Sequence, residues 1–129
     1  MTEEVKGKLE PIMLGRAPDG KYACQISRPE VVYVQGKANI VLRWIILEGE
    51  WKDEEIPDFY DLGKKAIWRL KRTLVNLGIS EPGVKKTIDP EDLPDLVDGL
   101  VTDIEVQWDE DFERYKVTEV YAIGSEIES

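Results

Sequence analysis

Histidine is absent from the 129 residues, and cysteine occurs only once, at Cys24. Because histidine is the commonest general base and metal ligand, its absence excludes Ser-His and Cys-His catalysis and zinc sites built from both residue types. A single cysteine cannot form an internal disulfide, which is typical of a reducing compartment. The sequence therefore predicts a protein that is not an enzyme and that has no cofactor and no catalytic or metal-binding residues.

Long apolar stretches are also missing. No run of about 18 apolar residues occurs, so no transmembrane helix is predicted. The chain begins MTEEVKGKLE, which lacks the apolar segment of a signal peptide. Together with the single cysteine, these features predict a cytoplasmic protein.

The net charge of −10 is unevenly distributed along the chain. Residues 62–86 contain seven lysines and arginines and one acid, whereas residues 87–129 contain two bases and 14 acids. Association with a polyanion depends on the local patch more than on the total charge, so a nucleic-acid partner remains compatible with an acidic chain. The run Asp109-Glu110-Asp111 is the best cluster for carboxylate-only metal binding, but its place between two predicted strands favours a solvated turn.

Alternating patterns predict strands on both sides of one helix. The second strand is the strongest, with Trp44 on one face and Arg43 on the other, and Pro29 and Pro57 mark a bend and an edge position. The predicted strands cover residues 21–34, 40–47, 51–60, 100–108 and 112–122. The resulting order β-β-β-α-β-β predicts a mainly β protein with the OB-fold, a five-stranded Greek-key barrel with one α-helix between strands 3 and 4.

The helix is predicted over residues 62–77, with Asp61 as its N-cap and Gly78 just after its end. Its apolar face is a single stripe made of Ile67, Leu70, Leu74 and Leu77. The connector that follows, residues 80–99, is rich in proline and aspartate and contains one short helical turn over residues 90–97. The chain length predicts one domain over residues 19–123, preceded by a leader or edge segment (1–18) and followed by a short acidic tail (124–129).

Two surfaces combine aromatic and basic side chains, a pattern in which rings stack bases and cations hold phosphates. On the helix, one flank is predicted to carry Lys64, Trp68, Lys71 and Arg72, with Lys65 and Arg69 further round on the solvent side. On the face of strands 2 and 3 and the loops beside it, where OB-folds bind ligands, the candidates are Tyr33, Lys37, Arg43, Arg114, Tyr115 and Lys116. Core packing explains at least half of the 11 aromatic residues without a ligand, and the bases of the helix can be a solvated face. Which surface binds stays open.

Two blocks carry a resemblance to a known family: VLRWIILEGEW over residues 41–51, and KKAIWRLKRTLVNLGI over residues 64–79. They resemble a family of small bacteriophage proteins, long catalogued as a domain of unknown function, whose members include single-stranded-DNA-binding proteins with OB-folds. The resemblance covers residues 18–122. One departure is the acidic segment Lys52-Asp53-Glu54-Glu55, where such proteins usually carry Lys-Gly-Arg. The resemblance implies a protein of the host cytoplasm that coats single strands during phage DNA replication or recombination.

The function predicted on these grounds is largely sequence-independent binding of single-stranded DNA, with phage or host replication and recombination proteins as further partners. An exposed edge strand over residues 51–60 could pair with a second copy, so a homodimer is one of the alternatives. The sequence does not distinguish a preference for DNA from a preference for RNA. The rival hypothesis is an acidic protein-interaction module that docks a basic partner or mimics DNA, motivated by the acidic segment from residue 87 onward.

Overall fold

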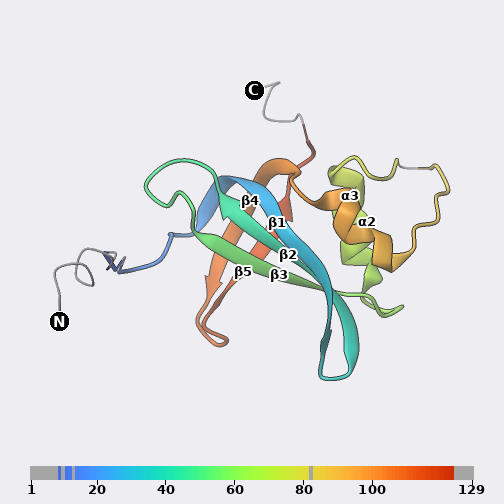
Figure 1. Ribbon diagram of the computed structural model, residues 1–129, viewed down its shortest axis with the longest axis horizontal. Coiled ribbons are helices and arrows are strands. Elements are labelled where there is room, and N and C mark those ends of the chain that lie inside the picture. The colour runs from blue at the N-terminus through green and yellow to red at the C-terminus, as the bar shows by residue number, and fades with distance from the viewer. Residues whose placement is uncertain (1–8, 10, 13, 82, 124–129) are drawn as a thin grey trace.

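The computed structural model describes residues 9, 11, 12, 14–81 and 83–123, so the predicted tail and most of the predicted leader lie outside the described residues. Five strands form one antiparallel sheet in the order β3-β2-β1-β4-β5 (Figure 1). They are β1 (Gly20–Val34), β2 (Lys37–Ile46), β3 (Glu55–Asp61), β4 (Val101–Asp109) and β5 (Arg114–Val120). The mainly β architecture with five strands is confirmed.

Between β3 and β4 the chain forms α2 (Ile67–Asn76), a 3₁₀ turn η1 (Pro90–Asp92) and α3 (Leu93–Val97), which lie beside one end of the sheet (Figure 1). The helical turn predicted over residues 90–97 is observed as η1 and α3, so the structure has two short helices between β3 and β4, where the predicted fold has one. The edge strands β3 and β5 do not pair with each other in the described part of the chain, so the closed barrel is not observed. No helix of the described residues is long and apolar enough to cross a membrane.

Strand β1 is long and bent, as predicted. Its pairing with β2 shifts register between Ser27 and Glu30, around Pro29, and Arg28 has a positive φ of 47°. A bulge of this kind re-aims the strand and increases its twist. Because of this bend, β1 pairs with β2 along most of its length and with β4 over residues 20–25.

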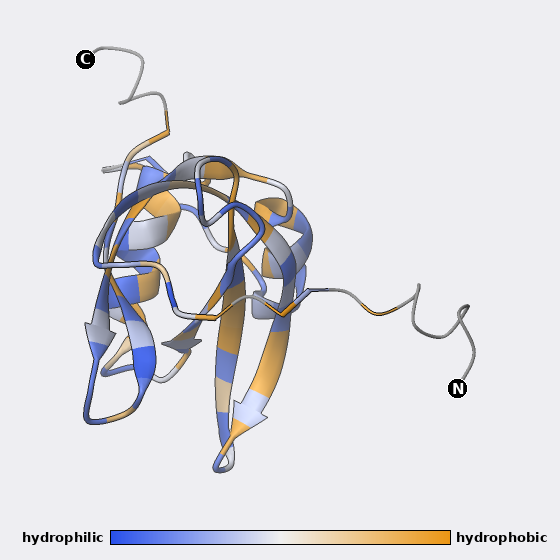
Figure 2. Cartoon of the chain, turned by 90° about the vertical axis from the view of Figure 1, so that its left-hand side faces the viewer, coloured by the Kyte–Doolittle hydropathy of each residue, from blue (hydrophilic) through white to orange (hydrophobic). Residues whose placement is uncertain are grey.

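The core lies on one face of the sheet. The alternation predicted for β2 is confirmed, since the four apolar side chains on the Trp44 face are buried: Ile40, Leu42, Trp44 and Ile46. Hydrophobic and hydrophilic residues alternate along the strands in Figure 2. Arg43, next to Trp44, points to the other face and is half-buried.

Strand β3 begins later than predicted. Residues 51–53 form a turn instead, in which the Asp53 N–H donates to the Ile46 carbonyl at 2.8 Å, and Gly49 and Asp53 have φ values of 86° and 73°. Such left-handed conformations end a strand. Pro57 does lie on an edge strand, as expected.

Helix α2 also begins later than predicted, at Ile67. The Asp61 carboxylate accepts a hydrogen bond from the Gly63 N–H at 2.7 Å and so closes a turn instead of capping the helix. The end is confirmed: Gly78 has a φ of 79°, and the Ile79 N–H donates to the Leu74 carbonyl at 3.0 Å. This is the Schellman arrangement that glycine favours.

Candidate nucleic-acid interface

A groove of about 610 Å³ opens between the edge strands β3 and β5 and the β4–β5 hairpin. A second hollow, of about 340 Å³, lies between α2 and β5. The two share Arg69, Lys116 and Val117 in their walls, so they form one continuous surface. We call this surface, from the β4–β5 hairpin to α2, the edge groove.

The guanidinium of Arg69 spans the gap between the two edge strands. One of its nitrogens lies 2.7 Å and 3.0 Å from the carboxylate oxygens of Asp58 on β3 and 3.4 Å from the carbonyl of Val117 on β5. The other donates to the Phe59 carbonyl at 3.2 Å, and the group stacks over the Tyr60 ring at 4.2 Å. Arg69 thus bonds both strands where no backbone ladder joins them.

This position differs from the prediction, which placed Arg69 on the solvent side of the helix. A helical wheel gives the direction of each side chain around the helix axis but does not include the strands that pack beside the helix. Here Asp58 is 8% exposed, and no strand of the described residues pairs with the outer edges of β3 and β5, so the carboxylate and the edge carbonyls require another donor. The Arg69 side chain supplies this donor and therefore lies against the sheet.

The pKa of the buried Asp58 carboxyl is shifted from its ordinary value. Burial raises the pKa of Asp58 above its ordinary value, and the charge and hydrogen bonds of Arg69 oppose that shift. Burial also raises the pKa of Tyr60 well above its ordinary value, with the Asp58 charge adding to the shift, so this phenol stays neutral. The Trp44 indole N–H is buried and makes no hydrogen bond of good geometry among the described residues, although its position beside Asp58 lowers the pKa of that carboxyl.

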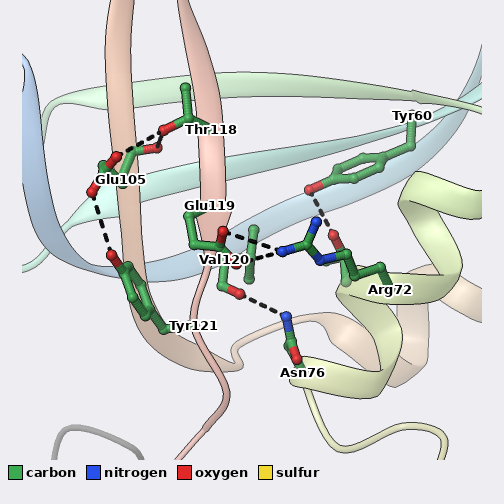
Figure 3. Close-up of polar contacts among 9 residues, drawn as sticks. Tyr60, Arg72, Asn76, Glu105, Thr118, Glu119, Val120 and Tyr121 are labelled. Carbon is green, nitrogen blue, oxygen red and sulfur yellow. Dashed lines mark hydrogen bonds and ion pairs between the residues drawn. The ribbon is translucent and has the colours of Figure 1, made fainter. Parts of the chain in front are cut away.

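Helix α2 is fixed to β5 by polar contacts, shown in Figure 3. Arg72 forms an ion pair with Glu119 at 3.2 Å, and the Asn76 amide donates to the Val120 carbonyl at 2.8 Å. These contacts hold the exposed Trp68, one turn earlier on the helix, over the wall of the groove. Trp68 is 62% exposed, so it does not complete the helix's core contact.

Aromatic rings follow the groove. Phe112 at the hairpin turn is 69% exposed, and Phe59 on β3 is 44% exposed. The turn is fixed because the Asp109 carboxylate accepts hydrogen bonds from the N–H groups of Asp111 and Phe112, which confirms the acidic run as a turn. Two signals in the sequence could have selected these rings: Phe59 alternates with the inward-facing Asp58 and Tyr60, and Phe112 lies in an acidic turn.

Tyr115, a predicted site residue, lines the groove but is held by structural contacts. Its ring meets Trp108 edge to face at a centroid distance of 5.1 Å, and its hydroxyl donates to the Ala17 carbonyl at 2.9 Å. It therefore supports the hairpin and the segment before β1.

The cations divide into paired and unpaired groups. Among the described residues, every arginine except Arg114 is in an ion pair with a carboxylate. Arg43, for example, lies 2.8 Å from Glu30 and also bonds the Arg28 carbonyl, so it is engaged with the bulge of β1. Arg114 and Lys116 line the edge groove without an ion pair in that part of the chain, which leaves them available to phosphate.

Three further predicted lysines gather at the opposite end of β3. Lys37, Lys64 and Lys65 line a hollow of about 440 Å³ between the β1–β2 turn and the loop before α2. Tyr33, 76% exposed, lies on the same hairpin. The β1–β2 and β4–β5 hairpins project toward the same side of the sheet in both views (Figures 1 and 2).

Lys71 is separated from the other helix residues. It lines a different, apolar groove of about 440 Å³ between α2 and the connector over residues 80–93. The predicted flank of Lys64, Trp68, Lys71 and Arg72 is therefore not observed, because Lys64 precedes the helix and Lys71 faces away from β5. Trp68, Arg69, Arg72, Arg114, Tyr115 and Lys116 are brought together.

No protein-family model and no curated protein matches this chain.

Proposed function

We propose that this protein is a non-catalytic binder of single-stranded DNA with little sequence preference, and that the edge groove is its binding surface. One observation carries the proposal: exposed aromatic rings and unpaired cations line the same open margin of the sheet. Rings offer stacking faces to any base, and cations neutralise phosphates without reading sequence.

We further propose that the chain is an OB-fold protein of the bacteriophage type that its sequence resembles. The support is the strand order, in which β1 pairs with both β2 and β4 and lies at the middle of the sheet. The two hairpins flanking β3 correspond to the loops beside which OB-folds bind oligonucleotides. Phage replication or recombination remains the predicted setting.

In the proposed complex, bases stack on Phe112, Phe59 and Trp68 while Arg114 and Lys116 contact phosphates. Each stacked base contributes about 1–3 kcal/mol. Arg69 positions the groove, since its two terminal nitrogens already bond Asp58 and the strand carbonyls.

The test is fluorescence anisotropy of a labelled oligo-dT of about 30 nucleotides, long enough to span the groove. We expect saturable binding that weakens with salt and that unlabelled single strands, but not duplex, compete away. Phe112→Ala and Trp68→Ala should each weaken binding about fivefold to hundredfold, the range that one lost stack implies. Leu96→Ala, an exposed apolar position on α3, is the matched control and should bind as the parent does.

Absence of binding at low salt would overturn the proposal and favour the rival, a protein-interaction module. The exposed acids Glu110, Asp111 and Glu113 at the hairpin turn are the surface on which that rival depends. Capture of basic replication proteins without any affinity for oligonucleotides would support it. Competition by oligo-U in the same assay reports the preference between DNA and RNA.

A further inference from the structure

The second half of strand β1 has a neighbour on one side only. Strand β4 pairs with β1 over residues 20–25, and the contact ends at Ile26, which bonds Gly99 and Leu100 through backbone groups at 2.9 Å. Beyond Ile26 the strand continues to Val34, and there β2 is its only strand partner among the described residues. The β1–β2 hairpin, which projects beyond the rest of the sheet in Figure 1, therefore has an open strand edge.

The backbone of this open edge has unused hydrogen-bonding groups. In an antiparallel pair, residues that bond the partner strand alternate with residues that direct their N–H and C=O groups away from it. Tyr33 opposes Ala38, whose carbonyl accepts from the Leu62 N–H at 3.0 Å, on the side of β2 that faces away from β1. Tyr33 and Ala38 are thus a pair without mutual hydrogen bonds. Tyr33 and, two residues earlier, Val31 therefore direct backbone donors and acceptors toward the open edge.

The side chains of this edge favour pairing with another strand. Residues 31–34 are Val-Val-Tyr-Val, all of types with high strand propensity. Tyr33 is 76% exposed and Val34 is 43% exposed. Free edges of proteins usually carry a lysine, a proline or a bulge that prevents association, whereas this stretch has none of them, since the bulge of β1 ends at Glu30. Such an edge is a template for a further strand.

The other two edges of the sheet are less open. Strands β3 and β5 face each other across the edge groove, and the Arg69 guanidinium bonds carbonyls of both. The edge predicted to be exposed over residues 51–60 is therefore already in use within the chain. A surface for a further strand is better supplied by β1.

A second copy of the same edge matches this one. If two β1 strands run antiparallel about a twofold axis at Val32, then Val31 of one copy lies opposite Tyr33 of the other. Both residues direct N–H and C=O groups outward, so this pair exchanges two hydrogen bonds, and the axis generates a second such pair. A register displaced by one residue would oppose outward groups to groups already bonded to β2. The backbone thus selects one register for self-pairing.

The charges at the ends of this pairing are complementary. In the same register Val34 of one copy opposes Glu30 of the other, and Lys37 lies beside Val34 on β2. Because opposed residues share a face of the sheet, Lys37 and the Glu30 of the second copy flank Val34 on one face. Lys37 forms no ion pair within the described part of the chain, and the Glu30 side chain is 54% exposed although it contacts Arg43. The axis places one such pair of opposite charges at each end.

We propose that two copies of the chain join residues 30–34 of their β1 strands in this antiparallel register. The contact is isologous, because the same surface is used by both copies, so it closes at a dimer. The paired segment is short, which places the interface among small and transient ones, and we expect a dissociation constant in the micromolar range. The proposal assigns Tyr33 and Lys37, which were predicted to bind DNA, to the dimer contact. It does not depend on DNA binding, since the edge groove lies outside this contact.

The first test is sedimentation velocity without DNA at protein concentrations up to about 1 mM, where even a millimolar contact is detected. We expect the mass to rise from that of a monomer to that of a dimer and then to stop. Amide hydrogen exchange locates the contact. Exchange at Val31 and Tyr33 should slow as the protein concentration rises, whereas exchange along β5 should not change.

A matched pair of variants tests the backbone pairing. Tyr33→Pro removes an outward N–H, and proline is tolerated in a strand where no bond of its own ladder is lost. Tyr33→Thr is the control, because it also removes the ring but keeps the N–H. The dimer contains this hydrogen bond twice, so the dissociation constant of Tyr33→Pro should exceed that of Tyr33→Thr by at least about tenfold. The circular dichroism of the two dilute variants should be the same.

Charge variants test the register. Lys37→Glu and Glu30→Lys each place like charges at both ends of the pairing, so each variant alone should associate more weakly than the parent. A mixture of the two should form a dimer, because every contact between unlike variants again joins opposite charges.

Three results would overturn the proposal. They are a parent protein that stays monomeric up to about 1 mM, a parent assembly that grows beyond a dimer, and a Tyr33→Pro variant that dimerises as well as Tyr33→Thr. The last result would show that the copies meet at another surface. Since no oligonucleotide is present, each result leaves the proposed DNA binding untouched, and loss of DNA binding leaves this test intact.

Discussion

The centre of the sheet and its open edge are held together by different interactions. At the centre, β1 pairs through backbone hydrogen bonds with β2 on one side and β4 on the other, above a core in which Cys24, Ile26 and Trp44 are buried. At the edge, no ladder joins β3 to β5 in the described part of the chain, and the side chain of Arg69 bonds both strands instead.

The difference explains where a ligand surface can form. Paired strands bury their polar backbone and direct apolar side chains inward, so little of the centre is exposed to a ligand. The edge is closed by one guanidinium, which leaves the rings of Phe59, Phe112 and Trp68 exposed on either side of it. In this molecule the candidate interface is therefore the part of the sheet that the backbone does not close.

The largest expected effect concerns the Cys24 thiol, whose reactivity tests whether the centre of the sheet is closed to solvent. Burial raises its pKa from 9.0 to about 12, with the Asp103 charge adding to the effect, so the reactive thiolate is about a thousandfold scarcer than for an exposed thiol. We expect a disulfide reagent to label native protein at pH 8 at least about thirtyfold more slowly than protein unfolded in urea, because the scarcity of the thiolate outweighs its higher nucleophilicity and the burial of Cys24 slows the reaction further. Rapid labelling of the native protein would show that the centre opens readily and would remove the contrast with the edge.

The second-largest expected effect is a loss of stability at the edge, where Arg69→Gln removes the ion-pair partner of the buried Asp58 carboxylate. Breaking a buried ion pair costs about 3–5 kcal/mol, and the low end applies because the Arg69 side chain is 36% exposed to water. We expect the free energy of unfolding, measured in urea at pH 7, to fall by about 3 kcal/mol. A loss below about 1 kcal/mol, the range of surface ion pairs, would show that Arg69 does not join the edges.

The pH dependence of this variant has a definite sign. Burial raises the pKa of Asp58, and without Arg69 nothing of comparable size opposes that shift, whereas the unfolded chain titrates near its ordinary value. The loss of stability should be complete above the raised pKa and should shrink as the pH falls through it, because the folded state then binds the proton. The double variant Asp58→Leu/Arg69→Met removes both charges and should recover most of the stability at pH 7. A loss independent of pH would assign the effect to packing.

Much of this architecture follows from local patterns in the sequence. The alternation around Trp44 is strict, so the inward face of β2 could be predicted, and Gly78 marks the end of α2 because its left-handed conformation favours glycine. The start of α2 could not be predicted by counting turns. Asp61 can serve either as a helix cap or as the acceptor of a turn, and the choice depends on Gly63.

The candidate site was harder to predict than the fold. Its cations fall in the predicted set, but their roles depend on distant partners: Arg69 on Asp58, Arg72 on Glu119 and Arg43 on Glu30. These pairs join residues 11, 47 and 13 positions apart, which no local pattern reports. The sequence therefore does not show which basic residues form ion pairs. In the described residues most arginines are paired with carboxylates, whereas Lys116 in the edge groove is not.

The smallest predicted effect compares one unpaired lysine at the edge with one paired lysine at the centre. Lys116 lines the edge groove, whereas Lys21 on β1 lies 3.5 Å from Asp103 and 4.4 Å from the Tyr121 ring centroid. If DNA lies in the groove, Lys116→Gln should reduce the slope of log affinity against log salt concentration by about 0.7, the value of one single-strand phosphate contact, and Lys21→Gln should leave the slope unchanged. Both variants remove the same charge, so their contribution to the long-range field is alike. Equal slopes in the two variants would mean that net charge, not the open edge, governs binding, because only a direct contact distinguishes them.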